Sequence, residues 1–143
     1  MNILQGILHN TPLLAALAAW AIAQGAKILL TLLLERQLDL TRIVGTGGMP
    51  SSHSALTMAL SFSIGKYWGF DSPYFAIALI FSFVVMYDAA GIRRAAGKQA
   101  EIINMLILHH QMPDMEKLKE LLGHTPLEVA VGAILGIGIG LWL

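Results

Sequence analysis

The stretch PYFAIALIFSFVVMY, residues 73–87, carries no charged side chain. It begins a predicted helix that continues to about Ile92, and roughly 20 apolar residues are enough for a helix to cross the hydrocarbon of a bilayer. Three further apolar runs extend over about Pro12–Leu34, Ser51–Trp68 and Pro126–Leu143. The sequence therefore predicts an all-α integral membrane bundle with four transmembrane spans.

The composition supports this prediction. The 143 residues are 56% hydrophobic and 13% charged, whereas a soluble domain is about 25% charged. A surface so poor in charge most simply faces lipid. The length of the chain fits a single domain over residues 1–143. A net charge of zero argues against a nucleic-acid partner. The absence of cysteine excludes disulfides and thiol nucleophiles.

The N-terminus lacks the basic start and the cleavage site of a signal peptide, so the first apolar run is expected to remain as a span. Two long connections, Glu35–Met49 and Arg93–Thr125, are then predicted on one side of the membrane. Residues 93–125 contain two helix candidates, an interfacial helix at Gly97–His110 and a second helix at Asp114–Leu122. The basic residues of these connections are Arg36, Arg42, Arg93, Arg94, Lys98, Lys117 and Lys119.

The opposite side holds only Lys66. Because cytoplasmic loops carry an excess of Lys and Arg, we expect the long connections to lie in the cytoplasm, with the protein in a plasma or inner membrane.

A histidine stands at the start of each of two predicted spans, on the same side of the membrane. Pro50-Ser51-Ser52-His53 opens the second span, where the serines can cap the helix and its free N–H groups can hold an anion. Gly48, just before, would let the backbone approach a ligand closely. The alternative is a serine-capped helix after a glycine turn, with His53 as an interfacial residue.

His124 precedes the last span, in the string GHTPLE at residues 123–128. Thr125, Pro126 and Glu128 fit a capping box, which explains the carboxylate structurally. The functional alternative is that Glu128 fixes the tautomer of His124 and supports its charge. The two roles compete for one side chain.

Two charged residues are predicted to lie within or at the edge of the hydrocarbon, where an unpaired charge is costly. Asp88 should pair with Arg93, Arg94, Lys27 or a histidine, and Lys27 should face the interior of the bundle. Cations and helix N-termini suit a phosphoryl group. Two histidines can divide the roles of nucleophile and acid.

Three strings resemble the divergent branch of the type 2 phosphatidic acid phosphatases, a superfamily related to the vanadium haloperoxidases. They are GGMPSSHSA from Gly47, YDAAGIRRAAGKQA from Tyr87 and LGHTPLEV from Leu122. The resemblance extends from about Gln24 onward. It implies that His124 attacks phosphorus to form a phosphohistidine and that His53 protonates the leaving oxygen. It also implies that the phosphate is held by Lys27, Arg93 or Arg94, Ser51 and Ser52.

The chain departs from the family pattern at four points. Leu34 occupies the place of the first-motif arginine, and Ser52 replaces the usual glycine of the second motif. Arg94 precedes His124 by thirty residues rather than six, and Glu128 replaces an aspartate. Asp88 is therefore an alternative acid partner for His124.

The leading function is a metal-independent membrane phosphatase that needs no cofactor and acts on a phospholipid or polyprenyl phosphate or diphosphate. One alternative is a non-catalytic protein that binds or transports a lipid phosphate. Another is a metal-dependent hydrolase using His53, His124, Asp88 and Glu128, since imidazole and carboxylate ligands would allow it. On the last span, glycine recurs every four residues at Gly132, Gly136 and Gly140. This glycine face permits close helix packing, either within the chain or across a homodimer.

Overall fold

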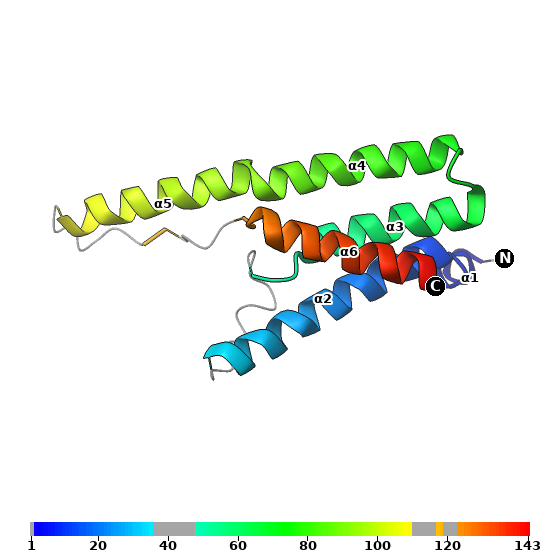
Figure 1. Cartoon of the computed structure of the whole chain (residues 1–143), viewed down its shortest axis with the longest axis horizontal. Coiled ribbons are helices and arrows are strands. Elements are labelled where there is room, and N and C mark those ends of the chain that lie inside the picture. Colours follow the sequence, from blue (N-terminus) through cyan, green and yellow to red (C-terminus); the bar gives the residue numbers. More distant parts are fainter. Residues whose placement is uncertain (1, 36–47, 110–116, 119–122) are drawn as a thin grey trace.

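The fold is a bundle of helices, and it is known from a computed structural model that describes residues 2–35, 48–109, 117–118 and 123–143. Helices account for 85% of these residues and no strand occurs among them, which confirms the all-α prediction. The helices are α1 (Ile3–Leu8), α2 (Thr11–Glu35), α3 (Ser52–Trp68), α4 (Pro73–Ala90), α5 (Ile92–His109) and α6 (Pro126–Trp142) (Figure 1).

The four predicted spans correspond to α2, α3, α4 and α6, with their starts placed to within one residue. Two described stretches are long and apolar enough to cross a membrane, Thr11–Leu33 and the nearly continuous Pro73–His109. The apolar α6 is shorter, and α3 is rich in serine. Four complete crossings therefore stay a prediction.

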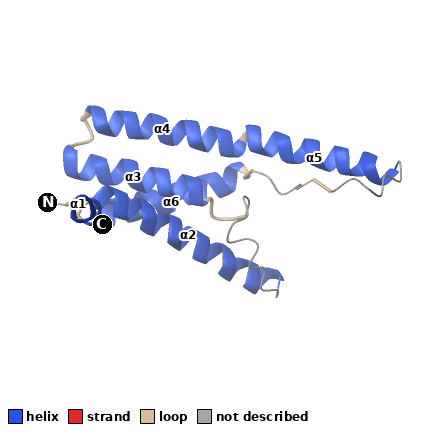
Figure 2. Ribbon diagram, turned by 180° about the vertical axis from the view of Figure 1, so that it is seen from behind, coloured by secondary structure: helices blue, strands red, loops and turns tan. Residues whose placement is uncertain are grey.

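Helix α3 lies at the centre and contacts α2, α4 and α6 (Figure 2). Its start is capped by Ser51, whose hydroxyl accepts a hydrogen bond from the N–H of Ser54. On the side facing α4, the hydroxyls of Ser61 and Ser82 are 2.8 Å apart. Within hydrocarbon such hydroxyls need partners, and this pair supplies them between two helices.

Helix α6 packs against α3 through small residues. Gly132, Gly136 and Gly140 are buried and face the backbone of Ser51, Ala55 and Ala59, respectively. A Cβ atom at any of the three glycines would collide with that backbone. Small residues let two helix backbones approach closely. Of the two kinds of packing that the glycine spacing allowed, the structure therefore shows the one within the chain. A homodimer stays a prediction, and it would need a different face.

Helix α5 continues α4 after the single residue Gly91 and extends beyond the rest of the bundle (Figure 1). It begins at Ile92, earlier than the predicted start at Gly97. Asn104 on its buried face makes two hydrogen bonds of 2.8 Å with the backbone of Leu118. The predicted helix Asp114–Leu122 falls mostly outside the described residues, and the described pair 117–118 is not helical.

The short helix α1 was not expected. Its signal is a capping box in which Asn2 and Gln5 exchange hydrogen bonds.

Candidate active site

The starts of α3 and α6 and the end of α4 meet at one end of the bundle, opposite the end where both chain termini lie (Figure 1). Two backbone hydrogen bonds join these segments. The N–H of His124 donates to the carbonyl of Ala89 at 2.9 Å, and the N–H of Ser51 donates to the carbonyl of Glu128 at 3.0 Å. Three strings far apart in the sequence are thereby held against one another.

Gly123 explains how His124 reaches this position. Its φ of +86° lies in the left-handed region, and its Cα packs against the backbone of Arg93 and Arg94 at the start of α5. A side chain would be strained in that conformation and would collide with that backbone. From the sequence, Gly123 was expected to cap the C-terminus of the predicted helix Asp114–Leu122, and its packing against the start of α5 was not predicted.

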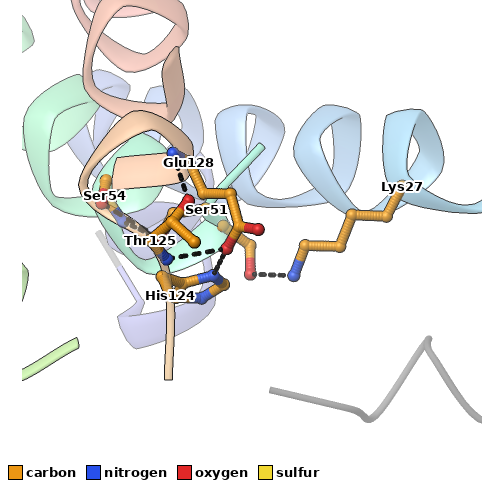
Figure 3. Close-up of polar contacts among 7 residues, drawn as sticks. Lys27, Ser51, Ser54, His124, Thr125 and Glu128 are labelled. Carbon is orange, nitrogen blue, oxygen red and sulfur yellow. Dashed lines mark hydrogen bonds and ion pairs between the residues drawn. The ribbon is translucent and has the colours of Figure 1, made fainter. Parts of the chain in front are cut away.

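His124 is 2% exposed and its ring is fixed by Glu128 (Figure 3). The distance between His124 Nδ1 and Glu128 Oε2 is 3.0 Å. The same oxygen accepts the N–H of Thr125 at 3.1 Å, and the Thr125 hydroxyl accepts the N–H of Glu128 at 3.3 Å. The capping box and the histidine contact were expected to compete, but one carboxylate oxygen serves both.

The protonation of His124 follows from these contacts. An ionised carboxylate can only accept hydrogen bonds, so the neutral imidazole carries its proton on Nδ1 and its lone pair on Nε2. Burial lowers the pKa of His124 below its usual 6.5, and the hydrogen bond to Glu128 opposes this shift. The charges of Lys27 and Arg93 lower the same pKa further. The ring is therefore held neutral, with its lone pair on the nitrogen that faces away from Glu128.

His53 lies beside His124, with 5.9 Å between the ring centroids and 63° between the ring planes. The Nδ1 atom of His53 and the Nε2 atom of His124 are both buried and have no hydrogen-bond partner among the described residues. Buried polar atoms are usually paired. Two unpaired ring nitrogens in adjacent histidines mark a place where a polar ligand would gain partners.

Two cations border the histidines. Lys27 is 3% exposed and faces the interior as expected, and its Nζ donates to the Ser52 hydroxyl at 3.3 Å (Figure 3). Arg93 is half exposed, and its Nε lies 2.7 Å from Asp88 Oδ2. Of the partners considered for Asp88, the structure selects Arg93, which leaves Glu128 as the acid partner of His124.

Other predicted site residues lie further from this contact network. Gly48 has a φ of +83° and forms the turn before the second motif, but no described contact joins it to either histidine. The side chain of Arg94 is exposed and likewise makes no described contact with them. Ser54 was not among the predicted site residues, and its hydroxyl donates to the Ser51 hydroxyl at 3.0 Å. Within the described residues, no group of three or more histidine, aspartate or glutamate side chains could hold a metal ion.

The comparison with known proteins shows the family of the chain. The chain matches the Divergent PAP2 family over residues 8–139, which include all the site residues named above. The chain belongs to the divergent PAP2 family. This confirms the resemblance drawn from the three sequence strings.

A relative of this PAP2 member is the uncharacterized membrane protein YuiD of Bacillus subtilis (strain 168). The two are 42% identical over 145 residues, which cover 92% of each chain. With the two long apolar helical stretches described above, this match supports a membrane protein. No solved structure matches the chain significantly.

Proposed function

We propose that this divergent PAP2 protein hydrolyses a lipid phosphate or diphosphate through a phosphohistidine intermediate. The observation that carries the proposal is the state of His124: it is buried, its Nδ1 is bound to Glu128, and its Nε2 lone pair has no partner among the described residues. A fixed, neutral imidazole with a free nitrogen is what nucleophilic attack requires.

In the first step, His124 Nε2 attacks phosphorus, an N–P bond forms, and the bond from phosphorus to the lipid oxygen breaks. His53 gives its proton to that oxygen, so the lipid leaves as a neutral alcohol, or as a monophosphate when the substrate is a diphosphate. In the second step, water attacks the phosphohistidine and gives a proton to His53. The N–P bond breaks, inorganic phosphate leaves, and both histidines return to their starting states.

The surroundings suit the charge that develops on the phosphoryl oxygens. Lys27 and Arg93 supply positive charge, and the positive ends of the dipoles of α3 and α6 both lie here. Lys27 is buried, and a buried charge stabilises a transition state more strongly than it would in water. Glu128 would stabilise the imidazolium character that His124 gains as its N–P bond forms.

The test is phosphate release from a short-chain lipid phosphate by protein purified in detergent with a chelator present. We expect His124→Ala and His53→Ala to lose release, while His9→Ala retains it, because His9 is exposed on the segment between α1 and α2 at the other end of the bundle. Unchanged release in His124→Ala would refute the phosphohistidine. Release only after metal is added would favour a metal-dependent hydrolase. Binding without release in the wild type would favour the non-catalytic alternative.

We also propose that the site end of the bundle faces the cytoplasm. Among the described residues, this end carries Arg93, Arg94, Lys98 and Lys117, while Lys66 lies at the other end, where its Nζ donates to the carbonyl of Trp142. Arg36, Arg42 and Lys119, which contributed to the same prediction, lie outside the described residues. Lys98→Cys should resist a membrane-impermeant thiol reagent in whole cells and react after lysis, whereas Lys66→Cys should react in both. The reverse pattern would invert the orientation.

A further inference from the structure

The central helix α3 has one face that no other helix among the described residues covers. Its residues Ala55 and Ala59 face the glycines of α6. At 3.6 residues per turn, His53, Leu60 and Ile64 lie on the opposite face. These three side chains are partly exposed, unlike the buried alanines.

An apolar groove runs along this uncovered face. Its floor is formed by Leu60, Ile64 and Trp68 of α3 and its walls by Leu13 of α2 and Tyr74 of α4, while Pro12 and the polar Asn10 line its end near the chain termini. This part has a volume of about 460 Å³. A second hollow of about 280 Å³ shares Leu60, Ile64 and Tyr74 and continues along α4 to Phe81. The two hollows adjoin at these three shared residues, and together they are called the groove, with α2 lining only the first hollow.

The groove points toward the histidine pair. Leu60 lies two turns from His53 on the same face of α3, which is about 10 Å along the helix axis. Between them, about one turn from each, is Leu56, whose partly exposed side chain offers an apolar surface from the end of the groove toward His53. A chain attached to a phosphate at His53 and His124 could therefore lie along Leu56 and enter the groove without leaving the surface of α3.

The distance along α3 from His53 to the far end of the groove indicates how long a bound hydrocarbon chain would be. From His53 to Ile64 the helix rises about 16 Å, and to Trp68 about 22 Å. One leaflet contributes about 15 Å of hydrocarbon, half of the bilayer core. With a phosphate at one membrane face, a chain that reached Trp68 would pass the bilayer midplane.

We propose that this groove, formed by α2, α3 and α4, is the tail site of the substrate, and that it holds a single hydrocarbon chain longer than one leaflet. The inference rests on the phosphate-binding part of the proposed function, but not on turnover. The cations at Lys27 and Arg93 fix the head of the ligand, and the apolar side chains from Leu60 to Trp68 receive its tail. The apolar surface that leads from the groove to the head site favours this occupant over unattached lipid or a second copy of the chain.

The experiment uses two monoalkyl phosphates with a photoreactive diazirine at the end of the chain, one about a leaflet long and one longer. Each is irradiated with the full-length protein in lipid vesicles, and the labelled residues are identified by mass spectrometry. We expect the shorter probe to label the region of Leu60 and Ile64, and the longer probe to label the region of Trp68 and Tyr74.

The labelling should depend on the head site. Arg93→Gln, a change at a half-exposed residue, should reduce groove labelling several-fold, as should an excess of unlabelled alkyl phosphate. An alkanol of the same length with the same diazirine should show no such dependence. Ile80, which is 63% exposed and lines neither hollow, is the internal control, and its labelling should be the same in wild type and Arg93→Gln.

Two results would overturn the inference. If Arg93→Gln and the competitor leave groove labelling unchanged, the groove holds bulk lipid. If Ile64→Cys, the sole cysteine of that variant, forms a disulfide-linked dimer in vesicles, a second copy covers the groove. A wild-type protein that is labelled as expected but releases no phosphate would contradict the proposed hydrolysis and leave the tail site standing.

Discussion

Replacing Glu128 with glutamine would test the central contact of the candidate site. The carboxylate oxygen Oε2 holds His124 Nδ1 at 3.0 Å and the N–H of Thr125 at 3.1 Å. A hydrogen bond to a charged group contributes about 1.5–3 kcal/mol, which corresponds to roughly 10- to 150-fold in rate if it acts fully in the transition state. A glutamine amide can also donate to Nδ1, which would move the ring proton to Nε2 and remove the attacking lone pair.

We therefore expect Glu128→Gln to lower kcat for phosphate release at least 10-fold. If the tautomer of His124 changes, the loss could reach about 10⁴-fold, which is the loss in a serine protease whose triad carboxylate is replaced by an amide. KM should change little, since Glu128 is placed to act on the histidine rather than on the phosphate. The assay is steady-state phosphate release in detergent, with folding checked by circular dichroism.

Thr125→Ala is the matched control, because it removes the other half of the capping box and leaves the contact between Glu128 and His124 in place. An N-cap substitution of this kind costs about 1 kcal/mol of stability. Its kcat should stay within about twofold of the wild type. Wild-type kcat in Glu128→Gln, or an equal loss in Thr125→Ala, would show that Glu128 serves only the helix cap.

Three further predictions follow from packing and charge. Gly136→Ala should lower the free energy of unfolding in detergent by about 1–3 kcal/mol through overpacking against Ala55, whereas Gly138→Ala, whose Cβ would meet no atom within 4 Å, should not. Gly123→Ala should displace His124 and abolish phosphate release, a result that a structure or activity assay of the variant would check. Because burial lowers the pKa of His124, protonation of the nucleophile, and the loss of kcat that it causes on acidification, should occur at a lower pH than for a free imidazole, which a pH profile of kcat would check.

The same pKa shift has a consequence for stability. The imidazole of His124 binds a proton more readily in the unfolded chain than in the folded one, so the unfolded state holds more protons as pH falls below 6.5. The free energy of unfolding should therefore decrease on acidification, and His124→Gln should reduce that dependence. An identical pH dependence in this variant would assign the effect to another group.

The positions of the helices followed from local sequence patterns. Helices α3, α4 and α6 are capped by Ser51, Ser72 and Thr125, respectively. In α4 and α6 a proline, Pro73 or Pro126, occupies the first helical position. Each of these starts can therefore be predicted from a few adjacent residues. The start of α5 was harder to predict. Helix α5 begins at Ile92 because the chain resumes helical geometry after one residue, whereas the predicted start at Gly97 relied on hydrophobicity alone.

The pairing of side chains required the tertiary structure. Asp88 had four possible partners in the sequence, and only the meeting of α4 with α5 selected Arg93. The spacing of Gly132, Gly136 and Gly140 indicated a close helix contact but could not identify the helix. Spacing within one helix fixes which residues share a face, and it carries no information about what lies opposite.

By itself, the sequence determined an apolar helical chain with His53 and His124 at helix starts on one side, because hydrophobic runs and caps are local properties. Only the tertiary structure decided that Glu128 holds His124 and caps α6 with the same oxygen, and that the His53 face of α3 is left uncovered between α2 and α4. The reason is physical: hydrogen-bond geometry and grooves depend on distances between segments far apart in the chain, and those distances are set by how the helices pack.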